Sequence, residues 1–120
     1  MKTSSLNLLP ATTFGSAVGN YDGTATTFSG EPVKAAAYYT KDKGAQTASW
    51  SLIGFVGVLT IEATLDADNT TSNYTAVHTI NAVTPLTEND YANLPGNFTW
   101  LRATATDFTA GTISQAAVGY

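Results

Sequence analysis

Few residues of this chain have side chains that commonly do chemistry in enzymes, and none of them stands in a known catalytic motif. His78 is the only histidine, and there is no cysteine that could share a metal with it. No G-x-S-x-G sequence presents a serine as a nucleophile, and no G-x-x-x-x-G-K sequence is present to bind a phosphate. We therefore interpret His78 as a residue on the polar face of a strand, and we expect no enzyme activity and no cofactor.

Three residues with oxygen-bearing side chains, Asp66, Asp68 and Asn69, stand close together as they do in a calcium-binding loop. Such a loop also needs a central glycine and a closing glutamate, and both are missing here. We therefore interpret this segment as a solvated acidic turn and predict no metal site in it.

The aromatic residues are the remaining candidates for a binding site. A carbohydrate site would stack a sugar on exposed rings, and Arg102, two residues after Trp100, would lie beside such a platform on the same strand face. The alternative is that the rings belong to the core or to a subunit interface, where large aromatics also dominate. The candidates for an aromatic interface or a sugar-stacking site are Trp100, Arg102, Tyr38 and Tyr39.

Composition indicates one small domain with an unusually neutral surface. The chain has 120 residues, of which 12% are charged, 21 are threonine and none is cysteine. The lack of cysteine excludes disulfides and favours a protein made in the cytoplasm. A net charge of −4 offers no basic footprint for nucleic acid. The longest apolar stretch, residues 52–59, is too short to cross a bilayer, so we expect no membrane insertion.

From residue 33 onward, segments rich in β-branched and aromatic residues alternate with turn residues. The spacing predicts strands over 33–40, 46–53, 58–65, 74–80, 97–106 and 112–120, a bend at 54–57, a turn at 107–111 and a longer connection over 81–96. This pattern predicts an all-β fold, a jelly-roll-like β-sandwich of about seven or eight antiparallel strands. Its core would contain Trp50 and the alternating row of Leu59, Ile61, Ala63 and Leu65.

Residues 1–32 differ from the rest, because they are rich in Thr, Ser and Gly yet carry large apolar side chains without a clear period. We interpret them as an extended N-terminal arm, separate from a β-sandwich domain of residues 33–120. Since ordering such a segment costs chain entropy, we expect the arm to be ordered only against a partner surface, as an assembly device. Its candidate contact residues are Leu6, Leu8, Leu9, Phe14, Tyr21 and Phe28.

Two blocks of sequence occur in a specific order. The first joins A-A-A-Y-Y at 35–39 to a tryptophan strand, a glycine-containing bend and I-E-A-T-L within 46–65. The second is G-N-F-T-W-L-R-A at 96–103, followed by G-T-I at 111–113. In this order and spacing, residues 33–120 resemble small β-sandwich virion proteins of tailed bacteriophages, especially cyanobacterial and marine phages. One departure is Tyr74, which stands near a position where that pattern often has a tryptophan.

The resemblance implies a structural protein of the virion, made in the host bacterial cytoplasm and without catalytic residues. The expected role is that of a capsid decoration protein that stabilises the phage shell. The alternative is a carbohydrate-binding or adaptor module of the tail, neck or fibre, which contacts the host surface. The expected partners are further copies of the chain, with a trimer favoured, and the major capsid protein or tail components, with a glycan as the ligand of the alternative.

Overall fold

The computed structural model describes residues 5–40 and 44–120, and the side chains of Ser5, Tyr39 and Thr40 lie outside the described part. Within these residues the chain forms one antiparallel sheet of seven strands and one short helix. The elements are β1 (Ser5–Leu9), β2 (Thr12–Thr13), β3 (Phe28–Ser29), β4 (Val33–Lys34), α1 (Ala37–Thr40), β5 (Ala45–Thr64), β6 (Thr75–Pro95) and β7 (Trp100–Gly119).

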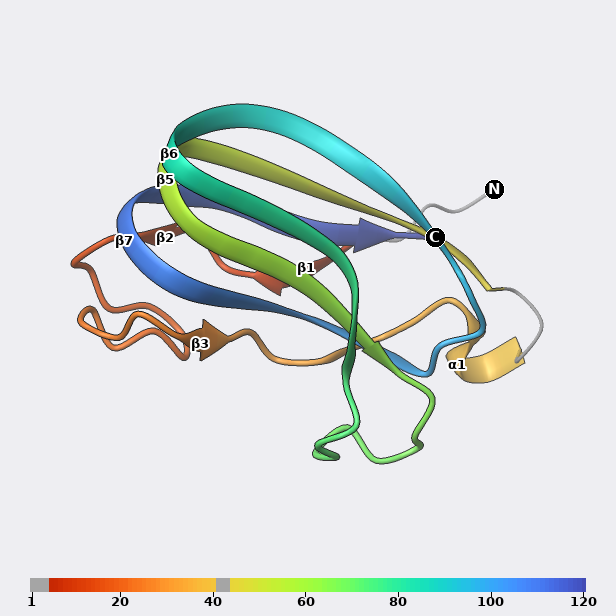
Figure 1. Cartoon of the computed structure of the whole chain (residues 1–120). Coiled ribbons are helices and arrows are strands. Elements are labelled where there is room, and N and C mark those ends of the chain that lie inside the picture. The colour runs from red at the N-terminus through yellow and green to blue at the C-terminus, as the bar shows by residue number, and fades with distance from the viewer. Residues whose placement is uncertain (1–4, 41–43) are drawn as a thin grey trace.

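The three long strands make the sheet fold back on itself. β5, β6 and β7 contain 20, 21 and 20 residues, whereas strands in globular proteins usually have about 5 or 6. All three curve sharply at one end of the molecule, on the left in Figure 1. At this bend the pairing register of β5 shifts between Leu52 and Val58. Each long strand therefore contributes one half to each of two packed layers.

Glycines allow this bend. Gly54 and Gly111 have φ angles of 59° and 89°, which residues with a Cβ rarely adopt. Their backbones also touch, because a Cβ on Gly111 would lie 2.2 Å from the carbonyl oxygen of Gly54. β5 and β7 can therefore turn side by side only with glycine at position 111.

The strand pairings define a jelly roll. The first layer contains, in order, β1 with β2, the end of β7, the start of β5 and the end of β6. The second contains β3 with β4, the start of β7, the end of β5 and the start of β6. Eight strand positions result when each long strand counts as two, and when β1 with β2 and β3 with β4 each count as one. Numbered in the order in which they occur along the chain, these positions are arranged 1-8-3-6 in the first layer and 2-7-4-5 in the second. Two Greek keys produce this order, so the predicted jelly-roll-like sandwich is confirmed.

Some predicted boundaries are wrong. Of residues 81–96, predicted as a connection, 81–95 form the greater part of β6. Pro85 and Pro95 were the reason for predicting a connection, because proline has no backbone N–H to donate. Both are tolerated since β6 is the edge strand of both layers, and the backbone on its open side needs no hydrogen-bond partner in the sheet. Residues 107–111 bend β7 without ending it, and the predicted strand over 33–40 consists of the short β4 followed by α1.

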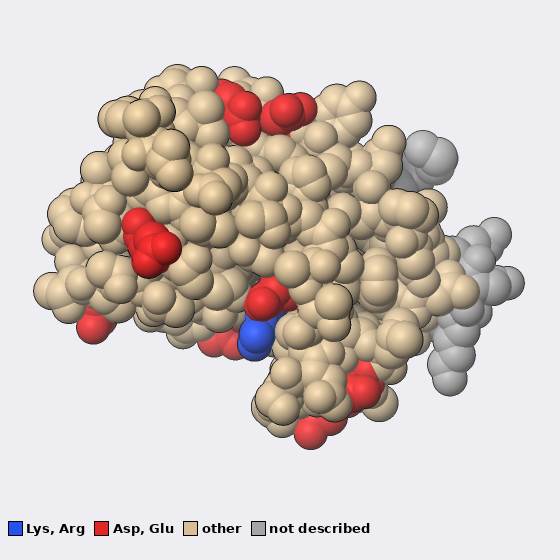
Figure 2. Space-filling view, in the orientation of Figure 1, with Lys and Arg blue, Asp and Glu red and all other residues tan. Residues whose placement is uncertain are grey.

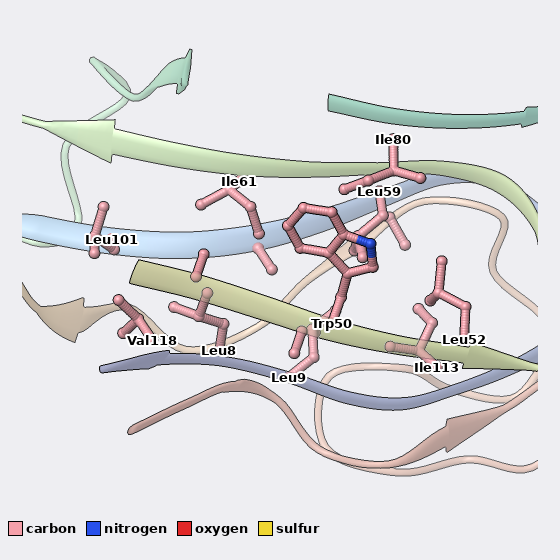
Figure 3. Packing of buried hydrophobic residues seen from close by; sticks show 14 of the residues in the cluster. Leu8, Leu9, Trp50, Leu52, Leu59, Ile61, Ile80, Leu101, Ile113 and Val118 are labelled. Atoms are coloured by element: carbon pink, nitrogen blue, oxygen red, sulfur yellow. The ribbon is translucent and has the colours of Figure 1, made fainter. Parts of the chain in front are cut away.

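The expectation of a separate N-terminal arm is also wrong. Its residues contribute to two strand positions of the jelly roll, since β1, β2 and β3 all pair with β7. Figure 3 shows Leu8 and Leu9 among the same buried side chains as Trp50 and Ile61, and Leu6 packs against this core. These apolar groups are therefore buried within the chain, without the partner surface that the composition led us to expect.

Aromatic rings fasten the middle of the N-terminal segment at the bend. Phe108, on β7, is fully buried and lies at the centre of a ring cluster. The centroid of its ring is 5.4 Å from that of Tyr21, 5.6 Å from Phe14, 5.7 Å from Phe55 and 5.8 Å from Phe28. Such pairs contribute about 0.5 to 1.5 kcal/mol each beyond the area they bury. The N-terminal segment and the bend therefore stabilise each other.

The predicted core row is confirmed except at its end. Trp50, Leu59, Ile61 and Ala63 are buried between the layers, whereas Leu65 is 70% exposed. The alternation of inward and outward side chains holds only while the strand continues, and β5 ends at Thr64. Leu65 therefore belongs to the loop that follows, where its side chain faces solvent.

Truncation of Ile61 tests the core assignment. Ile61 is 0% exposed, so Ile61→Ala should lower the free energy of unfolding by about 2 to 5 kcal/mol, through lost burial and the cavity left behind. Leu65→Ala removes an aliphatic side chain that packs little and serves as the matched control. Urea unfolding followed by circular dichroism should show the large loss for Ile61→Ala alone. Equal losses for the two variants would mean that Ile61 is not a core residue.

Deletion of residues 1–28 tests whether the N-terminal segment is part of the fold. The truncated chain should lack a cooperative thermal transition, because it loses β1, β2 and the buried Leu8, Leu9 and Tyr21. Circular dichroism and the dispersion of proton NMR signals measure this. The full chain carrying Phe14→Ser, at a partly exposed ring, should stay folded. A truncated chain that still unfolds cooperatively would restore the separate-arm interpretation.

Candidate functional site

A hollow of about 560 Å³ opens at the end of the sandwich opposite the bend, where α1 lies in Figure 1. Three separate segments meet there: α1, the loop after β5 and the connection between β6 and β7. Loops that a rigid scaffold positions are common places for binding residues. The lining residues are Ala37, Tyr38, Leu65, Ala67, Asn97 and Thr99.

Hydrogen bonds hold the loop after β5 in place. The backbone N–H and the hydroxyl of Thr99 donate to the carbonyl oxygen of Thr64 at 2.9 and 3.0 Å, and the hydroxyl also donates to the carbonyl oxygen of Asp66. The indole N–H of Trp100 donates to the carbonyl oxygen of Ala67 at 3.0 Å. With the backbone fixed on both sides, Leu65 presents its side chain to the hollow.

Two of the four predicted aromatic-site residues come together at this hollow. The ring centroids of Tyr38 and Trp100 are 5.1 Å apart, with their planes at 70°. The ammonium group of Lys34 lies 4.9 Å from the centroid of the Tyr38 ring. The backbone N–H of Tyr38 donates to the carbonyl oxygen of Ala35 at 3.0 Å, which fixes the start of α1. Tyr39 lies in α1, but its side chain is outside the described part.

Close packing of backbone and side chains positions Asn97. A Cβ on Gly44 would lie 2.1 Å from the side-chain oxygen of Asn97. Gly96 has a φ of 145°, and a Cβ there would lie 2.6 Å from the ring of Phe98. Asn97 therefore sits against bare backbone, and substitutions at Gly44 or Gly96 would displace it.

Arg102 does not line the hollow. It forms an ion pair with Glu62, with 2.7 Å between Nε and Oε1, and its guanidinium lies 4.0 Å from the centroid of the Tyr74 ring. The hydroxyl of Thr104 donates to the same carboxylate oxygen at 2.7 Å. Burial raises the pKa of Tyr74, and the neighbouring Arg102 charge opposes this rise. Arg102 thus organises the outer face of the second layer instead of serving the aromatic pair.

The acidic loop turns its carboxylates onto its own residues. Thr71 and Asn73 donate side-chain hydrogen bonds of 2.6 and 3.0 Å to Asp66, and the backbone N–H and hydroxyl of Thr70 donate to Asp68 at 2.9 and 2.7 Å. These bonds lower the pKa of both carboxyl groups, with Thr71 the largest cause at Asp66. Across residues 5–40 and 44–120, no group of three His, Cys, Asp or Glu side chains is placed to hold a metal ion.

His78 faces the interior instead of the polar face that we predicted. Its ring stacks on Trp50, with 4.9 Å between the centroids and 28° between the planes. The indole N–H of Trp50 donates to Oε1 of Glu88 at 3.1 Å. Trp50 therefore joins Glu88 of the first layer to His78 of the second, a packing role that neither polarity nor spacing reveals.

Sequence reasoning missed most of the lining of the hollow. Leu65 was assigned to the core, and Asn97 and Thr99 were assigned to a strand without a role. The available signal was the end of the apolar alternation, followed at once by the acidic turn at Asp66. That signal shows where the loop after β5 begins, but it does not show that residues 97–99 lie beside this loop in the folded chain.

Comparison with family models, with curated proteins and with solved structures finds no match to this chain. In the part of the chain that the structure describes, no helix is long and apolar enough to cross a membrane. The fold and the geometry of the site are therefore the basis on which a function is proposed.

The acid titration of Asp66 tests the loop. Its hydrogen bonds favour the charged form, so the stabilisation is present above the usual pKa of 3.8 and is lost as the pH falls through the lower pKa of the folded chain. Thr71→Val should raise the pKa of Asp66 towards 3.8, measured by carbon NMR of the carboxyl groups. Thr70→Val is the control, because Thr70 donates to Asp68, and this variant should leave the pKa of Asp66 unchanged. An unchanged Asp66 titration in Thr71→Val would contradict this account.

Proposed function

We propose that this chain is a non-enzymatic structural protein of a phage virion, most simply a capsid decoration protein that stabilises the shell. The jelly-roll strand order carries the proposal, because this architecture is characteristic of viral capsid domains as well as of lectins. The resemblance of residues 33–120 to virion proteins of tailed phages supports the same role. Fold alone does not determine function, so the surface must also suit assembly.

The outer face of the first layer is suited to docking on another protein. Cross-strand pairing places hydroxyl and amide side chains, with one exposed tyrosine, on this face and no charged residue among them. Figure 2, a view of one side of the molecule, shows that most of the surface on that side is uncharged. The centres of protein interfaces generally contain few charged residues. Because this face has none, covering it would not remove water from a charged side chain. The neutral face consists of Thr47, Ser49, Ser51, Asn89, Tyr91, Asn93 and Gln115.

Hydrogen bonds within the neutral face keep its side chains ordered. The hydroxyl of Thr47 donates to Oδ1 of Asn93 at 2.9 Å, and the hydroxyl of Ser51 donates to Oδ1 of Asn89. Side chains that are already held lose less entropy when a partner covers them. We assign this face to the major capsid protein or to a tail component, and self-association, with a trimer favoured, to the assembled particle.

A second candidate function is that of an adaptor or carbohydrate-binding module of the tail, neck or fibre. The hollow beside Tyr38 and Trp100 favours this candidate, because an open hollow with an aromatic side chain in its lining suits a ligand site and is not needed for attachment to a capsid. The two candidates differ in copy number, since a decoration protein covers the shell and a module at the tail tip is present in few copies.

Quantification in purified phage particles tests the proposal. A decoration protein should give a band of the same order of intensity as the major capsid protein, and a tail module should give a small fraction of it. Antiserum against the recombinant chain identifies the band. Complete absence from purified particles would overturn both candidates.

The neutral face has its own control in the same assay. Purified protein is added to phage particles that lack this chain, and its attachment is measured. Ser49→Lys places a charge on the neutral face and should weaken this attachment. Thr79→Lys, on the exposed face of the other layer, should attach normally. Equal attachment of both variants would place the docking surface elsewhere.

A further inference from the structure

We infer that the hollow at the loop end of the sandwich binds a neutral saccharide. The inference gives a ligand class to the second candidate function and rests on it. It concerns the six residues that line the hollow, which come from α1, from the loop after β5 and from the connection before β7.

The size and the charge of the hollow limit what it can hold. Its volume of about 560 Å³ lies within the range of about 300 to 1,000 Å³ that is typical of small-molecule sites. Among the described side chains that line the hollow there is no carboxylate, ammonium or guanidinium group, and the ammonium of Lys34 lies 4.9 Å from the centroid of the Tyr38 ring. A charged ligand would lose hydration against these lining side chains, and none of them carries an opposite charge to replace it. The lining therefore selects an uncharged molecule.

The apolar part of the lining matches the carbon face of a sugar ring. Tyr38 belongs to the lining, and the ring of Trp100 packs against it with 5.1 Å between the centroids. Beside it lies Leu65, whose side chain is 70% exposed and therefore available for contact. A pyranose has one face of C–H groups and a rim of hydroxyls, so its C–H face can cover such a surface while its rim stays wet.

The polar part of the lining distinguishes a saccharide from an apolar side chain of a protein partner. The amide of Asn97 offers both a donor and an acceptor, and the hydroxyl oxygen of Thr99, which donates to backbone carbonyls, can still accept. Adjacent sugar hydroxyls can use such a pair together. An apolar side chain would cover the Asn97 amide without a partner, which is costly. The site also exists before binding, because Thr99 and Trp100 already hold its loop.

NMR titration of the isolated full chain tests the inference without virions. The probes are maltotriose, cellotriose, mannotriose and chitotriose at millimolar concentration, with an oligogalacturonate as the charged counterpart. At least one neutral probe should shift the backbone amide signals of the lining residues, and the charged one should not. A shift pattern at a different surface, or no shift with any neutral probe, would overturn the inference while leaving the virion role intact.

Two variants and a matched control locate the contact. Asn97→Ala and Leu65→Ser should each weaken binding of the active probe by about tenfold, by removing a hydrogen bond or an apolar contact. Val83→Ser replaces another exposed aliphatic residue, 82% exposed and located on β6, and should bind like the unchanged chain. Equal binding by all three variants would overturn the inference. So would shifts at the hollow with a leucine-rich peptide alone, because they would assign it to a protein partner.

Discussion

The close approach of the β5 and β7 backbones at the bend is the constraint on which the two-layer structure depends. Gly111 touches the carbonyl of Gly54, and both residues have φ angles that disfavour a side chain. If the strands could not turn together here, the sheet would stay open and its apolar face would remain in water. The carbonyl of Gly111 also accepts a hydrogen bond of 2.9 Å from the N–H of Phe14, so the same point anchors the N-terminal segment.

The two ends of the sandwich have different physical roles. At the bend, rings from four segments pack around Phe108 and leave little room for change. At the other end, α1 and two loops meet, and hydrogen bonds from Thr99 and Trp100 join the loop after β5 to the connection before β7. A rigid bend therefore supports an end at which sequence can vary with less effect on the core. This separation is compatible with the proposal that one scaffold carries a docking face on its side and a ligand site at its tip.

The sequence predicted the fold class and most of the core, because both follow from local alternation and composition. Leu59, Ile61 and Ala63 were identified in this way. Prediction from the sequence failed where pairing between distant segments outweighs the local pattern of residues. Pro85 looked like a break, yet an edge strand tolerates proline. The polar N-terminal residues looked like a separate arm, since nothing local shows that β7 will pair with them. The candidate site followed the same rule: the aromatic residues Tyr38 and Trp100 stood out, but Asn97 and Leu65 did not, because only the fold brings their loops together.

The strand order also has a consequence for synthesis of the chain on the ribosome. β1 pairs with residues 116–119, which are made more than 100 residues later. The first layer cannot close until residues 116–119 have left the exit tunnel, so Leu8 and Leu9 lack these partners while the intervening residues are translated. Contacts between such distant residues also slow folding, because the long intervening loop must be closed first. This topology therefore delays closure of the first layer until both of these distant segments are available to pair.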